Sequence, residues 1–236
     1  TKAGIRFADE SGPGRYDFSR AHLRSAVEGS LKRLALERVD VLLLHRPDPL
    51  VEPGEVAEVL ETLRAEGKVG LFGVSNMNAA QIDLIDASLD HPIAVNQLEL
   101  SLARTAFLDA GVTVNDPRAP AAGAPCGTIE YCRAKGIQLQ AWSPLARGKY
   151  TGNDELLADG ADREAAALVA RLAAGKGASR EAVALAWLFR HPAGIQAVVG
   201  PTDPARIRAC AAAPDLELSR EEWYALWVAA RGAALP

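Results

Sequence analysis

Short apolar runs in this sequence carry, at their ends or within their last half, side chains that can form hydrogen bonds or stack on a ring. These side chains are His45, Ser75 with Asn76, Gln97 and Trp142. Neutral amides and a hydroxyl suit a ligand group that presents both a donor and an acceptor, such as a carboxamide. A flat aromatic side chain such as Trp142 can stack on a planar ring and hold one face of that ring toward a second reactant. These residue types are therefore compatible with a planar ligand that carries hydrogen-bonding groups.

Two further positions suit the phosphate groups of a ligand. Ser143 and Leu145 open a connection whose backbone N–H groups can bind a pyrophosphate. Asp203 followed by Pro204 is typical of a helix N-cap and first helical position, so Arg206 is expected just inside a helix start. A guanidinium and a helix N-terminus both favour a phosphate group.

The elements that must position these residues alternate along the chain. Runs that are apolar on both sides are typical of buried parallel strands, and they cover Val39–His45, Leu71–Ser75, Val95–Leu100, Leu139–Leu145 and Ala197–Gly200. Apolar residues at helical spacing lie between the runs and predict helices over 20–36, 54–66, 78–89 and 179–190. Repeated strand and helix predict a parallel sheet with right-handed crossovers.

Signals for helix ends agree with this assignment. Gly67 and Gly136 directly follow helical runs, where a residue of left-handed conformation commonly ends a helix. Ser219 and Glu222 have the spacing of a capping box ahead of a further apolar helix.

Two parallel α/β architectures compete, an open doubly wound sheet and a closed barrel. No GxGxxG motif follows a predicted strand, which disfavours the open dinucleotide-binding sheet. We therefore predict a (β/α)8 TIM barrel that forms a single domain over residues 1–236. The C-terminal strand ends of such a barrel share one mouth, where the polar residues above should meet. The long connections 101–127, with an irregular stretch Asp116–Pro125, and 146–162 should shape this mouth.

Five motifs in order give the chain its resemblance to a known family. They are Val41–Leu44 with His45–Asp48, then Gly67–Asn76, then Asn96–Glu99, then Trp142–Leu145 and finally Gly200–Arg206. These stretches resemble the fourth to eighth strand motifs of the aldo-keto reductases, and Thr1 with Lys2 resembles the end of that family's third strand. Each motif is weak alone, whereas the ordered set is specific.

The resemblance implies an NADP-dependent oxidoreductase that reduces the carbonyl of a small aldehyde or ketone to an alcohol. Hydride transfer from the cofactor is then coupled to protonation by a tyrosine. Lys2 matches the lysine that lowers the pKa of this tyrosine, and His45 matches the histidine that orients the carbonyl. The implied cofactor-binding residues are Ser75, Asn76, Gln97, Trp142, Ser143, Pro144, Leu145, Arg147, Gly200, Thr202 and Arg206. Arg206 would meet the 2′-phosphate, which favours NADP over NAD.

The chain departs from the family pattern at several positions. The family's catalytic aspartate and tyrosine lie upstream of the residue that Lys2 matches, and Tyr16, Tyr131, Tyr150 and Tyr224 all lie elsewhere. Gly200 stands where many members carry lysine and Cys210 where many carry asparagine, and both positions bear on the choice between NADP and NAD. We expect the first two βα units and most of the third strand to be absent.

This expected truncation has two consequences. Losing a positioned general acid costs on the order of 10²–10⁴ in rate, so the chain should lack turnover by itself. Unpaired barrel edges should favour self-association.

Other interpretations remain open at this stage. The chain could be a non-catalytic NADP(H)-binding barrel that acts as a sensor or subunit, or an isomerase or aldolase that forms a Schiff base on Lys2. Individual residues also have ordinary structural explanations. Ser75 and Asn76 could cap the following helix, and Arg46 could pair with Asp48 on the surface.

Composition excludes several other classes. The formal net charge is −4, and no cluster of lysine and arginine indicates a nucleic-acid face or a membrane surface. The apolar runs are too short to span a bilayer. Cys126, Cys132 and Cys210 form no metal-binding pattern, and their odd number disfavours a disulfide framework. The sequence thus predicts a cytoplasmic protein without a bound metal.

Overall fold

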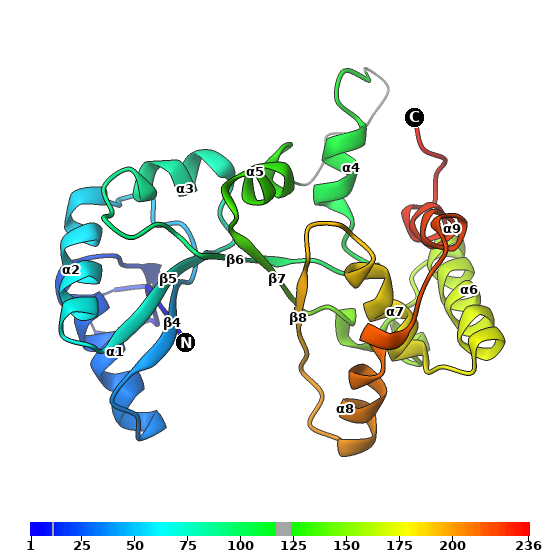
Figure 1. The fold of residues 1–236 in the computed structure, drawn as a ribbon, viewed down its shortest axis with the longest axis horizontal. Helices are drawn as coiled ribbons and strands as arrows, with labels where there is room; N and C mark the ends of the chain where they lie inside the picture. The colour runs from blue at the N-terminus through cyan, green and yellow to red at the C-terminus, as the bar shows by residue number, and fades with distance from the viewer. Residues whose placement is uncertain (11, 117–123) are drawn as a thin grey trace. The chain divides into compact units, whose positions relative to one another are not determined.

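The computed structural model describes residues 1–10, 12–116 and 124–236 (Figure 1). The chain divides into two compact units, each of which is described by itself. Unit 1 comprises Thr1–Leu98 and Tyr131–Gln138, and unit 2 comprises Glu99–Glu130 and Leu139–Pro236.

Parallel strands form the centre of unit 1. They are β1 (Lys2–Ala3), β4 (Val39–Leu44), β5 (Val69–Ser75) and β6 (Val95–Glu99), hydrogen-bonded in the order β1-β4-β5-β6. The pairing places Lys2 opposite Leu43 and Ser75 opposite Gln97. Because all four strands run in the same direction, their carboxyl ends lie along one edge of the sheet.

The helices of unit 1 cover the strands on one side, as Figure 1 shows for α1 (Arg20–Leu34), α2 (Pro53–Ala65) and α3 (Ala79–Asp86). Each helix buries an apolar stripe, including Leu23 and Val27 of α1 and Val56 and Leu60 of α2. An antiparallel hairpin of β2 (Ile5–Arg6) and β3 (Arg15–Tyr16) separates β1 from α1. The end of α5 (Thr128–Lys135) completes the unit.

Unit 2 contains two paired strands, β7 (Gln138–Trp142) and β8 (Gln196–Val198), which run parallel. Its helices are α4 (Ala106–Val112), α6 (Gly160–Lys176), α7 (Arg180–Phe189), α8 (Pro204–Ala211) and α9 (Arg220–Arg231), with short 3₁₀ turns η1 (Ala146–Gly148), η2 (Asp154–Leu156) and η3 (Ala213–Asp215).

Two tryptophans join α7 to α9 in the core of unit 2. The rings of Trp187 and Trp223 stack with centroids 5.3 Å apart. Each indole N–H donates to the backbone carbonyl of the other residue, at 3.1 Å from Trp187 and 2.8 Å from Trp223. The packing therefore buries two large apolar side chains without leaving their polar N–H groups unpaired.

The predicted elements are confirmed, with shifted ends. All five predicted strands form, but the run Leu139–Leu145 ends as a strand at Trp142, because Ser143 turns the backbone into the left-handed region with φ 54°. Gly67 and Gly136 have φ of 73° and 69°, as helix-ending glycines do. Asp203 caps α8, and Ser219 and Glu222 form the capping box of α9.

The architecture agrees with the predicted class of parallel α/β fold. No pairing that would close a barrel occurs among the strands of the described chain. The single domain over 1–236 stays a prediction.

Several elements were not foreseen. The hairpin of β2 and β3 has short strands without a clear apolar alternation, and α4 lies inside the connection 101–127 that was predicted as a loop. The connection 146–162 ends in the first turn of α6. Of the irregular stretch expected at Asp116–Pro125, residues 117–123 lie outside the described residues.

Candidate functional site

The strand ends of unit 1 are joined by hydrogen bonds around Ser75 and Gln97. The hydroxyl of Ser75, which is buried, donates to the backbone carbonyl of Gln97 at 2.9 Å. The backbone N–H of Asn76 donates to the same carbonyl at 3.0 Å. These bonds hold the end of β5 against β6. Because the hydroxyl hydrogen of Ser75 is used in the bond to Gln97, the Ser75 oxygen can act toward a ligand only as a hydrogen-bond acceptor.

Asn76 connects a third strand end to this cluster. Its side-chain Nδ2 donates to Ser75 Oγ at 2.9 Å and to the backbone carbonyl of His45 at 3.3 Å. The backbone of Asn76 is left-handed, with φ 59°, a conformation that asparagine tolerates better than most residues. Asn76 therefore connects the ends of β4 and β5 through its side-chain amide, and it connects β5 to β6 through its backbone N–H.

Lys2 and His45 lie at the same edge of unit 1. Strand β1 pairs with β4, and the backbone N–H of His45 donates to the carbonyl of Ala3 at 2.9 Å. Burial lowers the pKa of His45, and the positive charges of Lys2 and Arg46 lower this pKa further. The imidazole is therefore neutral at pH 7, where its single N–H can donate to a carbonyl oxygen.

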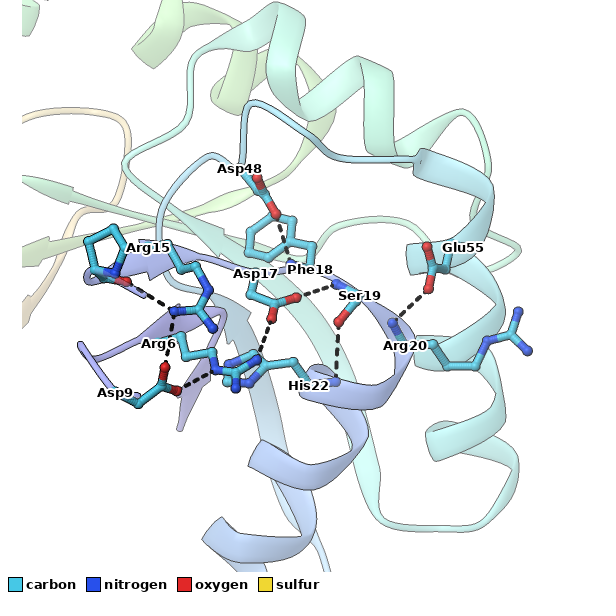
Figure 2. Close-up of polar contacts among 11 residues, drawn as sticks. Arg6, Asp9, Arg15, Asp17, Phe18, Ser19, Arg20, His22, Asp48 and Glu55 are labelled. Atoms are coloured by element: carbon cyan, nitrogen blue, oxygen red, sulfur yellow. Dashed lines mark hydrogen bonds and ion pairs between the residues drawn. The ribbon is translucent and has the colours of Figure 1, made fainter. Parts of the chain in front are cut away.

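A polar network fixes the segment that follows Lys2 (Figure 2). Asp48, which is buried, accepts hydrogen bonds from the backbone N–H of Phe18 at 2.8 Å and of Leu50 at 3.0 Å. Arg6 of the hairpin pairs with Asp17, whose carboxylate also accepts from the N–H of Ser19. These contacts attach the hairpin and the start of α1 to the connection after β4.

Two structural explanations from the sequence are wrong. Asp48 does not serve as a surface partner of Arg46, because its carboxylate is buried and accepts backbone N–H groups. Ser75 and Asn76 do not cap α3. The cap is Asn78, whose side chain accepts from the N–H of Gln81 at 3.0 Å while the Gln81 side chain accepts from the N–H of Asn78.

In unit 2 the connection after β7 lines a groove. The backbone is left-handed at Ser143, Ala146 and Arg147, with φ of 54°, 45° and 60°. Such turns can orient successive N–H groups toward an anion. The groove has a volume of about 300 Å³ and is lined by Ser143, Pro144, Leu145, Ala146, Arg147, Gly148, Gly200, Pro201 and Arg206.

Arg206 is the charged residue on the α8 side of this groove. Asp203 caps α8 by accepting from the N–H of Ala205 at 2.9 Å, which places Arg206 in the first turn. Its Nε pairs with Glu181 of α7 at 3.2 Å, and its Nη2 lies 3.5 Å from the hydroxyl of Thr151. The guanidinium is thus held at the groove, where positive charge and the helix N-terminus act together.

Sequence reasoning missed the residue that anchors the groove loop. Asp162 of α6 is buried and binds Lys149 Nζ at 2.7 Å, the hydroxyl of Tyr150 at 2.9 Å and the N–H of Ala158 at 2.8 Å. Burial by itself raises the pKa of Asp162, but these partners lower it by more, so the net pKa lies below its usual value. The only signal in the sequence is the helix-start pair Asp159 and Asp162, which does not reveal the partners.

The structure gathers most of the predicted site residues into two sets. Lys2, His45, Ser75, Asn76 and Gln97 lie along the carboxyl edge of the unit 1 sheet. Most of the predicted residues of unit 2 line its groove, namely Ser143, Pro144, Leu145, Arg147, Gly200 and Arg206. Trp142 and Thr202 adjoin this set in sequence without lining the groove. The roles of both sets stay predictions.

The environments of two tyrosines do not suit a general acid. The hydroxyl of Tyr131 donates to Asp83, and the buried hydroxyl of Tyr150 donates to Asp162. Burial raises the pKa of both phenols, and the neighbouring carboxylates raise it further. Neither hydroxyl is therefore prepared to release its proton to a substrate.

Metal sites and membrane-spanning helices are both absent from the described residues. Within residues 1–10, 12–116 and 124–236, no group of three or more His, Cys, Asp or Glu side chains could hold a metal ion. No helix in the described part of the chain is long and apolar enough to cross a membrane.

This sequence matches a model of a known protein family. The model described as "Aldo/keto reductase family" matches residues 1–227. An uncharacterized oxidoreductase of Bacillus subtilis (strain 168), YcsN, is 35% identical over 243 residues, which cover 100% of this chain and 74% of that protein.

Two further relatives share one named activity. A protein named 6-dehydroglucose reductase from Agrobacterium fabrum is 34% identical, over 92% of this chain and 65% of the relative. A second protein of that name, from Novosphingobium aromaticivorans, is 36% identical, over 95% of this chain and 67% of the relative. The chain thus spans about two thirds to three quarters of the length of these three relatives.

A solved structure shares the fold. The crystal structure of the thermostable aldo-keto reductase Tm1743 in complex with the inhibitor epalrestat superposes with a TM-score of 0.71 at 24% identity. The match covers 90% of this chain and 67% of the other.

Proposed function

Because the chain belongs to the aldo/keto reductase family, we propose that its protein is an NADP-dependent oxidoreductase that reduces aldehyde or ketone carbonyls to alcohols. The observation that carries the proposal is the cluster at the carboxyl edge of unit 1, where His45, Asn76 and Gln97 lie together. Hydride transfer is the chemistry that the nicotinamide cofactor supplies when bound.

The chemistry of the donor set fits such a cofactor. The Gln97 side chain contains both the donor and the acceptor that a carboxamide requires. Asn76 contributes its Oδ1 as an acceptor, because its Nδ2 donates to Ser75 and to the His45 carbonyl, and the Ser75 hydroxyl can accept a hydrogen bond. In unit 2 the groove loop has left-handed turns at three non-glycine residues, and Arg206 supplies a positive charge. Pyrophosphate suits the loop and an adenosine 2′-phosphate suits Arg206, which favours NADP over NAD.

His45 and Lys2 have separate roles in this proposal. The neutral imidazole of His45 donates a hydrogen bond to the substrate carbonyl, which orients the carbonyl and stabilises negative charge as it develops on the oxygen. Lys2 supplies a positive charge at the same edge, which favours the deprotonated form of a tyrosine acid.

Turnover further requires a proton donor. None of the four tyrosines of the 236 residues matches the family's donor, and Tyr131 and Tyr150 donate to carboxylates instead. We therefore propose that the 236-residue chain binds the cofactor but turns over at most slowly, and that full activity needs the family's Asp and Tyr motif.

The same observation favours a second candidate function, in which the protein binds NADP(H) without catalysis as a sensor or subunit. The two candidates predict the same cofactor binding by this chain. They differ when the family's Asp and Tyr motif is supplied in a longer protein, which restores carbonyl reduction only under the first candidate.

The substrate class follows from the named relatives. Two of them carry the name 6-dehydroglucose reductase, so we propose a polar, sugar-derived aldehyde as the substrate. In a version of the protein that contains the Asp and Tyr motif, 6-dehydroglucose should be reduced with a higher kcat/KM than an apolar aldehyde such as benzaldehyde. The reverse preference would contradict this choice.

Cofactor binding tests the proposal directly. Titration of the chain with NADPH should quench tryptophan fluorescence, and calorimetry should give a Kd for NADPH that is lower than the Kd for NADH. Trp142→Phe should remove most of the quenching, because Trp187, Trp223 and Trp227 are packed against one another in the core. A folded chain that gives neither heat nor quenching with either nucleotide would contradict both candidate functions.

Catalysis is tested in the version that contains the Asp and Tyr motif. His45→Ala should lower kcat/KM for carbonyl reduction by at least about tenfold while the Kd of NADPH stays the same, since His45 acts on the carbonyl in this proposal. Unchanged turnover would remove His45 from the mechanism. Borohydride trapping of substrate on Lys2, if observed, would instead indicate Schiff-base chemistry.

A further inference from the structure

The turn after β5, residues 76–78, is held at each of its three residues. The N–H of Asn76 donates to the Gln97 carbonyl, and Asn78 forms the capping box of α3 with Gln81. Between them Met77 is almost completely buried, and its backbone carbonyl accepts a hydrogen bond from Asn96 Nδ2 at 3.0 Å. The middle of the turn therefore depends on a side chain from the next strand.

Asn96 reaches this turn from the opposite face of β6 to Gln97. Successive residues of a strand point to opposite faces, and Asn96 directly precedes Gln97. The Asn96 side chain is fully buried, and its Nδ2 also lies 3.7 Å from the sulfur of Cys132 on α5. The same strand thus presents Gln97 on one face and supports the Asn76 turn from the other.

Only the Nδ2 end of the Asn96 amide is paired within the described residues. Its Oδ1 is buried and has no hydrogen-bond partner among residues 1–10, 12–116 and 124–236. Burying this unpaired oxygen is unfavourable, and the cost offsets what the hydrogen bond to the buried Met77 carbonyl contributes to stability. What the amide provides, and a leucine cannot, is the hydrogen bond to the carbonyl of Met77.

We propose that Asn96 is a positioning residue that holds Asn76 in place for the nicotinamide carboxamide. The hydrogen bond to Met77 fixes the residue next to Asn76, whose left-handed backbone would otherwise relax. Asn96 acts through Met77 and does not touch the ligand. This inference rests on the proposed function, because it assumes that Asn76 binds the nicotinamide end of NADP.

The test compares two ligands that share one end. NADP⁺ contains both the nicotinamide and the 2′-phosphorylated adenosine, whereas adenosine 2′,5′-bisphosphate lacks the nicotinamide. Calorimetry gives the Kd of each ligand for the wild-type chain, Asn96→Leu and Asn96→Ala. The control variant is Cys132→Ala, which opens space beside Asn96 without removing the bond to Met77.

The two ligands should respond differently. We expect Asn96→Leu and Asn96→Ala to bind NADP⁺ about tenfold more weakly, which corresponds to about 1.4 kcal/mol. Their Kd for adenosine 2′,5′-bisphosphate should be unchanged. Asn96→Leu should unfold in urea at about the same midpoint as the wild type, because loss of the unpaired Oδ1 offsets loss of the donor to the Met77 carbonyl. Cys132→Ala should unfold earlier, with both Kd values unchanged.

Other results would overturn the inference. Equal weakening of both ligands, no weakening of either, or failure of both Asn96 variants to fold would each show that Asn96 is only a core residue. If the wild type binds adenosine 2′,5′-bisphosphate and NADP⁺ with equal affinity, the proposed role of Asn76 fails first. If it binds neither ligand, the proposed function itself fails.

Discussion

The two sets of candidate site residues are built in different ways. In unit 1, polar groups at adjacent strand ends bond to one another, as Asn76 does with Ser75 and with the carbonyl of His45. In unit 2, the groove depends on backbone conformation, with left-handed residues between Ser143 and Gly148, and on Arg206 held by Glu181.

The side chains of the two sets are therefore held in position by different means. Parallel strands in register bring their ends together automatically, so each unit 1 residue needs only its place at a strand end. A loop without strand pairing needs anchors from elsewhere, which in unit 2 are Asp162 on α6 and Glu181 on α7. We therefore expect the unit 2 set to be more sensitive to the loss of a remote anchor.

The largest expected effect is the loss of the Asp162 anchor. Asp162→Ala should lower the free energy of unfolding by about 3 kcal/mol, because it leaves Lys149 and the buried hydroxyl of Tyr150 without their partner. Urea unfolding measures this loss. The exposed Asp154 of the same loop offers the control, since Asp154→Ala should change stability by less than about 0.5 kcal/mol. Equal effects of the two variants would contradict the anchoring role.

Asp162 also predicts an acid dependence. Because its folded pKa is depressed, its contribution to stability is present above the unfolded pKa of about 4 and is lost as the pH falls through the folded pKa. The stability difference between wild type and Asp162→Asn should therefore shrink as the pH is lowered below about 4. A difference that is independent of pH in this range would rule out the ionised carboxylate as its cause.

The next effect tests the close pairing of strands in unit 1. A Cβ at Gly73 would lie 2.3 Å from Leu43 Cδ2 and 2.9 Å from the carbonyl oxygen of Val95, so Gly73→Ala should cost about 2 kcal/mol of unfolding free energy. A Cβ at Gly175 in α6 would have open space around it, with no described atom within 4 Å apart from its chain neighbours and the backbone of its own helix. Gly175→Ala should therefore stabilise the fold by about 0.5–1 kcal/mol. Thermal unfolding of both variants measures these two changes. If Gly73→Ala left the free energy of unfolding unchanged, β4, β5 and β6 would be packed less tightly than their register implies.

A smaller effect tests which end of the ligand each of the two sets is proposed to bind. Arg206→Met should weaken adenosine 2′,5′-bisphosphate about tenfold, through loss of a charged hydrogen bond. Asn76→Gly keeps the left-handed backbone without strain. This variant should leave the Kd of adenosine 2′,5′-bisphosphate unchanged and weaken the binding of NADP⁺ about tenfold. Calorimetry with both ligands decides the assignment. The proposed assignment would be contradicted if Asn76→Gly weakened the binding of adenosine 2′,5′-bisphosphate and Arg206→Met did not.

The smallest effect concerns the protonation of His45. Since its folded pKa lies below the unfolded value of about 6.5, the unfolded chain binds more protons as the pH falls from about 7, and stability decreases. The titration of His45 followed by NMR should therefore give a pKa below the ordinary value. In Lys2→Gln this pKa should move upward, because one nearby positive charge is removed. An unchanged pKa of His45 in that variant would show that the charge of Lys2 does not act on the imidazole.

Much of the fold was predictable from local patterns. Runs apolar on both faces identified β4 to β8, and glycine and capping residues identified the ends of α2, α5, α8 and α9, because these signals depend on neighbours in the chain. The hairpin of β2 and β3 and the helix α4 escaped prediction, since their short segments lack a clear periodicity.

Part of the candidate site was also predictable from the sequence. Residues at strand ends and in the ordered motifs could be named in advance, including His45, Asn76 and Arg206. Asp48, Asn96 and Asp162 could not, because each acts through contacts with residues remote from it in sequence, such as Phe18, Met77 and Lys149.

The sequence by itself determined the family, the order of the parallel strands β4 to β8, and which side chains stand at or near the strand ends, since periodicity and motif order are properties of the linear chain. Only the tertiary structure decided which buried polar groups support those side chains. The hydrogen bond from Asn96 to Met77 and the ion pair of Asp162 with Lys149 depend on strand register and helix packing, and these bring residues into contact that no local pattern connects.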